Sequence, residues 1–67
     1  MLDSKKIEAQ RWLIEGYLHD AMYYEECAER NDPRGASKAW YLEQAKHKFE
    51  MAEWAERRLL WLLIGGA

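Results

Sequence analysis

Four large residues recur at seven-residue spacing near the middle and end of the chain: Trp40, His47, Trp54 and Trp61. Seven residues are close to two turns of an α-helix, so these side chains share one helix face. Met51 and Arg58 lie beside them in a helical projection. Tryptophan and arginine often dominate the binding energy of protein interfaces. We therefore expect an interface, with a second copy or with another protein, formed by Trp40, His47, Met51, Trp54, Arg58 and Trp61.

The adjacent arginines Arg57 and Arg58 lie between Trp54 and Trp61. Together these residues could hold an anionic or nucleotide-like ligand between chains by charge and stacking. A simpler alternative is that the two cations offset the dipole at the C-terminal end of a helix, which requires no ligand. The sequence leaves both explanations open.

Carboxylates are numerous, but their spacing does not favour a metal site. A carboxylate-bridged metal site in a helical bundle uses a glutamate three residues before a histidine. Here Glu15 and Glu43 lie four residues before His19 and His47. We expect no metal ligands, and a metal-binding carboxylate bundle is the least favoured alternative.

No grouping of catalytic residues is apparent. The serines Ser4 and Ser37 lie where helices are expected to begin, a usual place for serine. Cys27 follows Glu25 and Glu26 rather than the basic residues that activate a thiol. The sequence also lacks a glycine-rich phosphate loop before a helix. We expect neither enzymatic activity nor a cofactor.

Length and charge narrow the class of protein. A chain of 67 residues forms one domain and rarely builds a sufficient core alone. With one cysteine it cannot form an internal disulfide, so self-association is the expected source of additional stability. A net charge of −2 disfavours general nucleic-acid binding. The charged N-terminal segment has no secretory apolar region, and we expect a cytoplasmic protein.

The chain ends in an apolar run, residues 59–64, that covers every side of its last helical turns. The run is too short to span a bilayer. It could contact a membrane surface, with Arg57 and Arg58 at the headgroups. Burial between protein chains is favoured instead, because the apolar stripes of the preceding helix continue into it.

The pattern of apolar residues predicts an all-α antiparallel two-helix hairpin that assembles into a homo-oligomeric helical bundle. Residues 1–67 form one domain, with helices over about 4–30 and 36–64 and a turn at 31–35. Asp3 suits a helix N-cap, and Leu2 would pack on Ile7. The second helix begins at Pro33 or near Ser37, and the glycines at 65–66 end it.

Facing residues should pair large side chains with small ones across the hairpin. The expected contacts include Leu18 with Phe49, Ile14 with Ala52, and Ala28 with Ala39. The second helix would contribute Leu42, Ala45, Phe49, Ala52, Leu59 and Leu63. Its tryptophan stripe would then lie opposite the hairpin contact. Gly16 interrupts the first helix, either as a tolerated exposed glycine or as a point of close approach for another chain.

In size and two-helix pattern the sequence resembles small proteins of phages and mobile elements that act as inhibitors or ligand sponges. The likeness is one of size and shape and carries no motif. The sequence thus predicts a small non-catalytic interaction protein that oligomerises and binds a partner protein through its aromatic helix face, an inhibitor of that type. A binder of small anionic ligands is the alternative.

Overall fold

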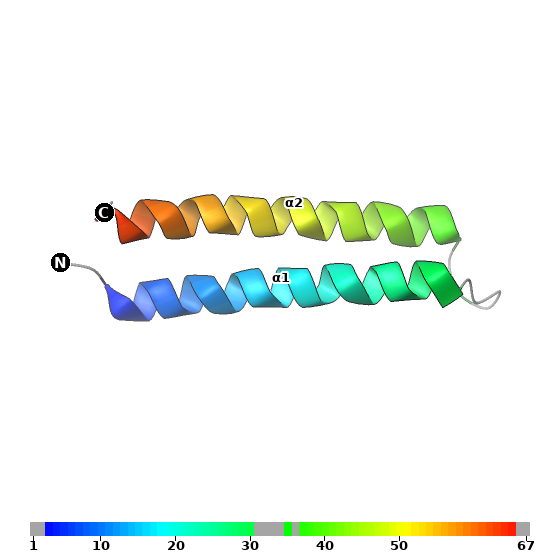
Figure 1. Cartoon of the computed structure of the whole chain (residues 1–67), viewed down its shortest axis with the longest axis horizontal. Coiled ribbons are helices and arrows are strands. Elements are labelled where there is room, and N and C mark those ends of the chain that lie inside the picture. The colour runs from blue at the N-terminus through cyan, green and yellow to red at the C-terminus, as the bar shows by residue number, and fades with distance from the viewer. Residues whose placement is uncertain (1–2, 31–34, 36, 66–67) are drawn as a thin grey trace.

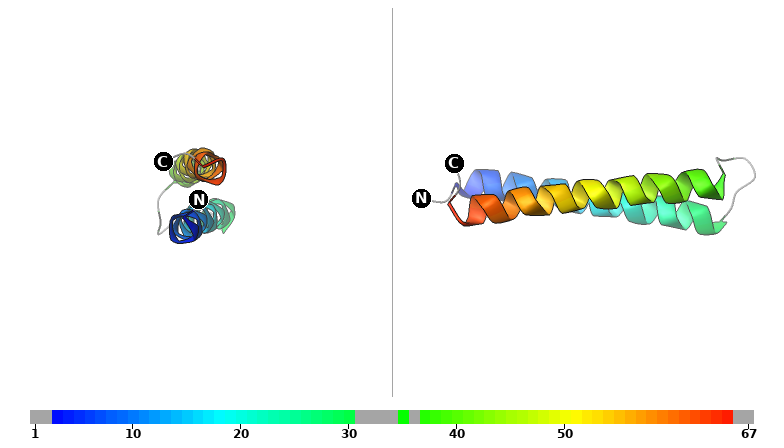
Figure 2. Two further views of the ribbon diagram at one scale, coloured as in Figure 1. Left: turned by 90° about the vertical axis from the view of Figure 1, so that its left-hand side faces the viewer. Right: turned by 90° about the horizontal axis from the view of Figure 1, so that it is seen from above.

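The computed structural model consists of two long antiparallel helices, α1 (Ser4–Arg30) and α2 (Lys38–Leu63). It describes residues 3–30, 35 and 37–65. The helices lie side by side along their length, with the first turn of α1 and the last turn of α2 at the same end of the hairpin (Figure 1). Seen from above, they cross at a shallow angle (Figure 2), as helices in coiled coils do. The prediction of an all-α helical hairpin is confirmed.

Polar side chains cap both helices at their N-terminal ends. The Asp3 carboxylate accepts hydrogen bonds of 3.1 and 3.2 Å from the amides of Lys5 and Lys6. The Ser37 hydroxyl accepts one of 3.2 Å from the amide of Trp40. These bonds satisfy amides that have no partner inside the helix. Ser37 therefore sets the start of α2, while the expected roles of Leu2 and Pro33 lie outside the described residues.

The hairpin contact follows a heptad pattern on both helices, and its centre consists of small side chains. Within the described ranges the buried residues are Ile14, Ala21, Ala28, Ala45, Ala52 and Ala55. Five of these six are alanines, so the helices can approach each other closely. Because alanine has only one methyl group to bury, a contact made of alanines limits the apolar area that the hairpin removes from water.

The structure corrects the expected contact face of α2. Phe49 is 38% exposed, Leu42 47% and Leu63 39%, so these side chains flank the contact instead of filling it. Ala39 is also exposed and does not meet Ala28. Phe49→Ala should therefore destabilise the hairpin by less than the roughly 3–5 kcal/mol that a fully buried phenylalanine contributes.

Lys48 lies at the edge of the hairpin contact, where the sequence pattern places Phe49. Its ammonium lies 3.9 Å from the Asp20 carboxylate and 5.8 Å from the centre of the Tyr17 ring, both on α1. Its side chain is only 28% exposed. A lysine can bury its aliphatic stem and keep its charge at the edge. A reading of the sequence that treats every lysine as solvent-facing misplaces this contact by about one position.

Gly16 lies in open space on the surface of α1. A β-carbon added there would meet nothing within 4 Å. Among residues 3–30, 35 and 37–65, no side chain or backbone of the other helix therefore contacts this position. At the other end of the hairpin, the backbone of Gly65 has φ +85°, the left-handed conformation that ends many helices. Neither α1 nor α2 has a stretch long and apolar enough to cross a membrane.

Candidate protein-binding groove

A groove runs along one side of the hairpin between the two helices. A hollow of about 300 Å³ in it is lined by Gln10, Leu13, Tyr17, Met51, Trp54, Ala55 and Arg58. Three of the lining residues come from α1 and four from α2. We refer to this surface, extended by Trp40, His47 and Trp61, as the aromatic groove. Of the six residues that the sequence predicts for an interface, Met51, Trp54 and Arg58 line the hollow itself, and Trp40, His47 and Trp61 continue their stripe along α2.

Trp54 is the most prominent side chain of the aromatic groove. It is 74% exposed, and Leu13 on the facing helix is also exposed. A tryptophan in contact with water leaves a large apolar area available for burial. Exposed apolar patches bordered by polar side chains are typical of interaction sites. This part of the groove is therefore suited to contact another polypeptide.

The groove continues toward the chain ends through Arg58 and Trp61. The Arg58 guanidinium carbon lies 4.7 Å from the centre of the Trp61 ring, a cation–π contact. A second hollow contains both side chains together with Lys6, Ala9, Gln10 and Leu62. Arg58 and Gln10 line both hollows, so the two are neighbours on this surface. This end of the groove combines an indole ring with two cationic side chains.

Toward the turn, Trp40 joins a cluster of aromatic rings. Its ring centre lies 6.0 Å from that of Tyr24 on α1 and 5.3 Å from that of Tyr41, both in edge-to-face geometry. Tyr23 contacts Tyr24 in the same manner at 5.7 Å. Such ring pairs favour a defined arrangement of side chains. His47 lies between this cluster and Trp54 along α2 and is exposed.

The position of the tryptophan stripe differs from the sequence expectation. Trp40 contacts α1 through Tyr24, and Trp61 shares a hollow with Lys6 and Ala9 of α1. The stripe therefore lies beside the hairpin contact and not opposite it, because α2 is rotated toward Lys48. As a consequence, α1 contributes Leu13 and Tyr17 to the surface. The seven-residue spacing of Tyr17 and Tyr24 was the available sequence signal for this contribution.

Cys27 lies next to the aromatic cluster on α1. It is partly buried. A hydrogen bond with Cys27, and the repulsion between the two groups when both are ionised, raise the pKa of the Tyr23 phenol. The phenol contributes a polar, uncharged group at the edge of the cluster.

The remaining candidate side chains do not gather into a site of their own. Arg57 is exposed and lines neither hollow of the groove. Across residues 3–30, 35 and 37–65, no three or more His, Cys, Asp or Glu side chains come together as metal ligands would. The expected alternative of a carboxylate metal site has no observation in its favour.

Comparisons with known proteins returned no relative for this hairpin. No protein-family model matches the sequence, and no curated protein or solved structure shows significant similarity to it. The functional argument therefore rests on the aromatic groove itself.

Proposed function

We propose that this chain is a non-catalytic interaction protein that self-associates and binds a partner protein through the aromatic groove. The observation that carries the proposal is the exposure of Trp54 between Leu13 and Met51, in a groove formed by both helices. Burying a ring of this size releases roughly 2 kcal/mol or more. Two such rings and an arginine on one surface match the composition of binding hot spots.

Self-association follows from the small core of the hairpin. Ile14 is the largest buried side chain in the described part of the chain, whereas Trp12, Trp54 and Ile64 are each more than 70% exposed. A stable protein normally buries side chains of this size. In a helical bundle of several copies, the large side chains that flank the alanines would form the core. We propose that assembly into the bundle fixes the orientation of the aromatic grooves. The grooves would then bind the surface of a target protein, as a small inhibitor does.

The test compares Trp54→Ala and the double variant Trp54→Ala/Trp61→Ala with the wild type. We expect retained helicity by circular dichroism, because neither ring lies in the alanine contact, together with loss of partner binding. The partner is identified first by crosslinking in cells, and its affinity is then measured with purified proteins. Glu26→Lys, an exposed change on α1 outside the groove, is the control. An affinity for the purified partner that the double variant leaves unchanged would refute the proposal.

A second candidate function is the binding of a small anionic aromatic ligand at the end of the groove. The supporting observation is that Lys6 and Arg58 line one hollow with the Trp61 ring. Charge and stacking on these three side chains would suit a nucleotide-like molecule. Titration with nucleotides, followed by tryptophan fluorescence, tests this function. We expect Lys6→Ala to weaken such binding, whereas a signal that is identical in the variant would argue against it.

A further inference from the structure

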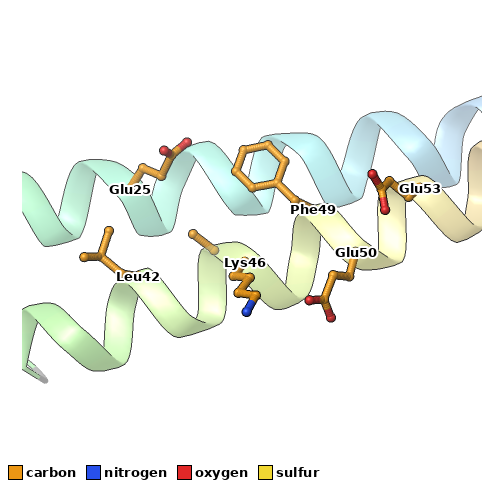
Figure 3. Close-up of a pocket in the computed structure, with 7 residues that line it drawn as sticks. Glu25, Leu42, Lys46, Phe49, Glu50 and Glu53 are labelled. Atoms are coloured by element: carbon orange, nitrogen blue, oxygen red, sulfur yellow. The ribbon is translucent and has the colours of Figure 1, made fainter.

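A second hollow surface lies on the side of the hairpin away from the aromatic groove. It is lined by Glu25, Leu42, Ala45, Lys46, Phe49, Glu50 and Glu53 and encloses about 380 Å³. In Figure 3 the Leu42 and Phe49 side chains extend from α2 on the side of α1, and Lys46 and Glu50 extend the opposite way. We call this surface the Phe49 face. It has an apolar centre and charged edges.

The charges on the Phe49 face have a specific order along α2. Ala39, Lys46, Glu53 and Leu60 follow one another at seven-residue spacing and so share one stripe of the helix. Along the stripe the side chains are, in order, small, positively charged, negatively charged and large. If it meets an identical stripe running in the opposite direction, Lys46 lies against Glu53 and Ala39 against Leu60. If the stripes run in the same direction, like charges face each other.

From this order we infer that the Phe49 face binds a second copy of the chain, with the two α2 helices antiparallel and related by a two-fold axis beside Phe49. In a two-fold interface each contact occurs twice, so Lys46 and Glu53 form two equivalent ion pairs. The axis falls between positions 49 and 50, so the Phe49 rings and the Glu50 side chains of both chains lie next to it. Leu60, which is 62% exposed in the single chain, is covered where the partner presents the small side chain of Ala39.

The dimensions of the hairpin are compatible with such a dimer. The chain measures 52 by 15 by 12 Å along its principal axes. One long side is therefore comparable in size to the roughly 800 Å² that each partner buries in a stable interface. Because the Phe49 face and the aromatic groove are on different sides of the hairpin, both grooves of the dimer remain open. This inference rests on the self-association in the proposed function and assigns it to one surface.

The charge order allows a test by exchange of charges. Lys46→Glu places two glutamates opposite each other on both sides of the two-fold axis, and Glu53→Lys places two lysines there. We expect each single variant to dimerise at least tenfold more weakly than the wild type, because like charges in contact oppose association. An equimolar mixture of the two variants restores opposite charges at both positions. It should form heterodimers with an affinity close to that of the wild type.

Native mass spectrometry with one variant labelled with ¹⁵N measures homodimers and heterodimers in the same sample. Lys5→Glu, which makes the same charge change on the outer side of α1, should leave the dimer unchanged. Circular dichroism must show unchanged helicity in all variants. Recovery on mixing supports the two-fold arrangement. Single variants that dimerise normally, or a mixture that does not recover, would overturn it.

The same measurements separate this inference from the proposed function. A wild-type chain that stays monomeric at micromolar concentration would refute self-association altogether. A dimer that is lost in Trp54→Ala/Trp61→Ala but not in Lys46→Glu would keep self-association and overturn only the assignment to the Phe49 face.

Discussion

The side-chain amide of Gln10 donates a hydrogen bond of 2.9 Å to the backbone carbonyl oxygen of Ala55, which joins α1 to α2 across 45 positions of the sequence. A carbonyl oxygen has two lone pairs, so Ala55 can accept this bond in addition to a helical one. The bond is partly buried and lies at the centre of the aromatic groove, between its two hollows. It sets the position of one helix relative to the other at the site.

Replacing Gln10 with glutamate should make the stability of the hairpin dependent on pH. At pH 7 the carboxylate cannot donate and faces a carbonyl oxygen, so we expect a loss of about 1–2 kcal/mol. A protonated glutamate can donate, which raises the pKa of this group in the folded state. The stability difference from wild type should therefore shrink as the pH falls through this raised folded-state pKa, and it should be smallest below about pH 4, the ordinary pKa of glutamate.

Chemical denaturation at pH 3, 5 and 7 measures this difference. Gln10→Met is the matched control, because methionine is similar in length but cannot donate at any pH. A deficit of Gln10→Glu that does not diminish in acid relative to the methionine variant would contradict the role assigned to the bond.

Ala21 should not tolerate a larger side chain. It is 0% exposed in the hairpin contact, where the other helix also presents buried alanines. We expect Ala21→Leu to destabilise the protein by about 1–3 kcal/mol, because the helices must separate or the side chain must adopt a strained rotamer. Ala9→Leu, at an exposed site on the same helix, is the control in thermal unfolding. Equal melting temperatures for the two variants would place the contact elsewhere.

The glycines at positions 16 and 65 should respond in opposite directions to replacement by alanine. Gly16 has open space around its α-carbon, so Gly16→Ala should stabilise α1 by about 1 kcal/mol through higher helix propensity. Gly65 has φ +85°, so Gly65→Ala should cost about 1–2 kcal/mol. Thermal unfolding monitored by circular dichroism measures both. A destabilising Gly16→Ala would indicate that another chain packs against this position in the assembly.

Ser37 should contribute to stability as the N-cap of α2. Ser37→Ala removes the acceptor for the Trp40 amide and should cost about 1 kcal/mol, whereas Ser37→Asp should retain the cap. Ser4→Ala is the matched control, since the Asp3 carboxylate caps α1. Urea unfolding measures the stability of each variant. If Ser4→Ala and Ser37→Ala lose comparable free energies of unfolding, the hydroxyl of Ser37 does not stabilise the start of α2.

Much of the fold was predictable from local features of the sequence. The helices are defined by local chemistry that acts within one turn. The features that define them are two long stretches without internal proline, the caps Asp3 and Ser37, and Gly65 at the end. The buried positions of α1 were also predictable, because Ile14, Ala21 and Ala28 are small or apolar and recur every seven residues. The members of the aromatic stripe were identifiable for the same reason.

The rotation of α2 was not predictable from the pattern of apolar residues, because this helix has apolar side chains on several sides. Phe49 and Lys48 are neighbours in the sequence, and hydrophobicity alone favours Phe49 for the contact. In the structure Lys48 lies at the contact instead. Its aliphatic stem packs inward, and its ammonium lies near Asp20 and Tyr17. The close approach of two alanine surfaces excludes a ring as large as phenylalanine from the centre.

By itself, the sequence determined that this protein has two helices, about where the first begins and ends and where the second ends, and which large residues share a face, since these properties depend on neighbours along the chain. It left the start of the second helix open between Pro33 and Ser37. Only the tertiary structure decided that Tyr24 meets Trp40, that Gln10 meets Ala55, and that Leu13 completes the groove around Trp54. Those relationships depend on how one helix is rotated against the other. That rotation depends on side-chain volume and on polar contacts between the helices, such as those of Gln10 and Lys48, and periodicity alone does not predict it.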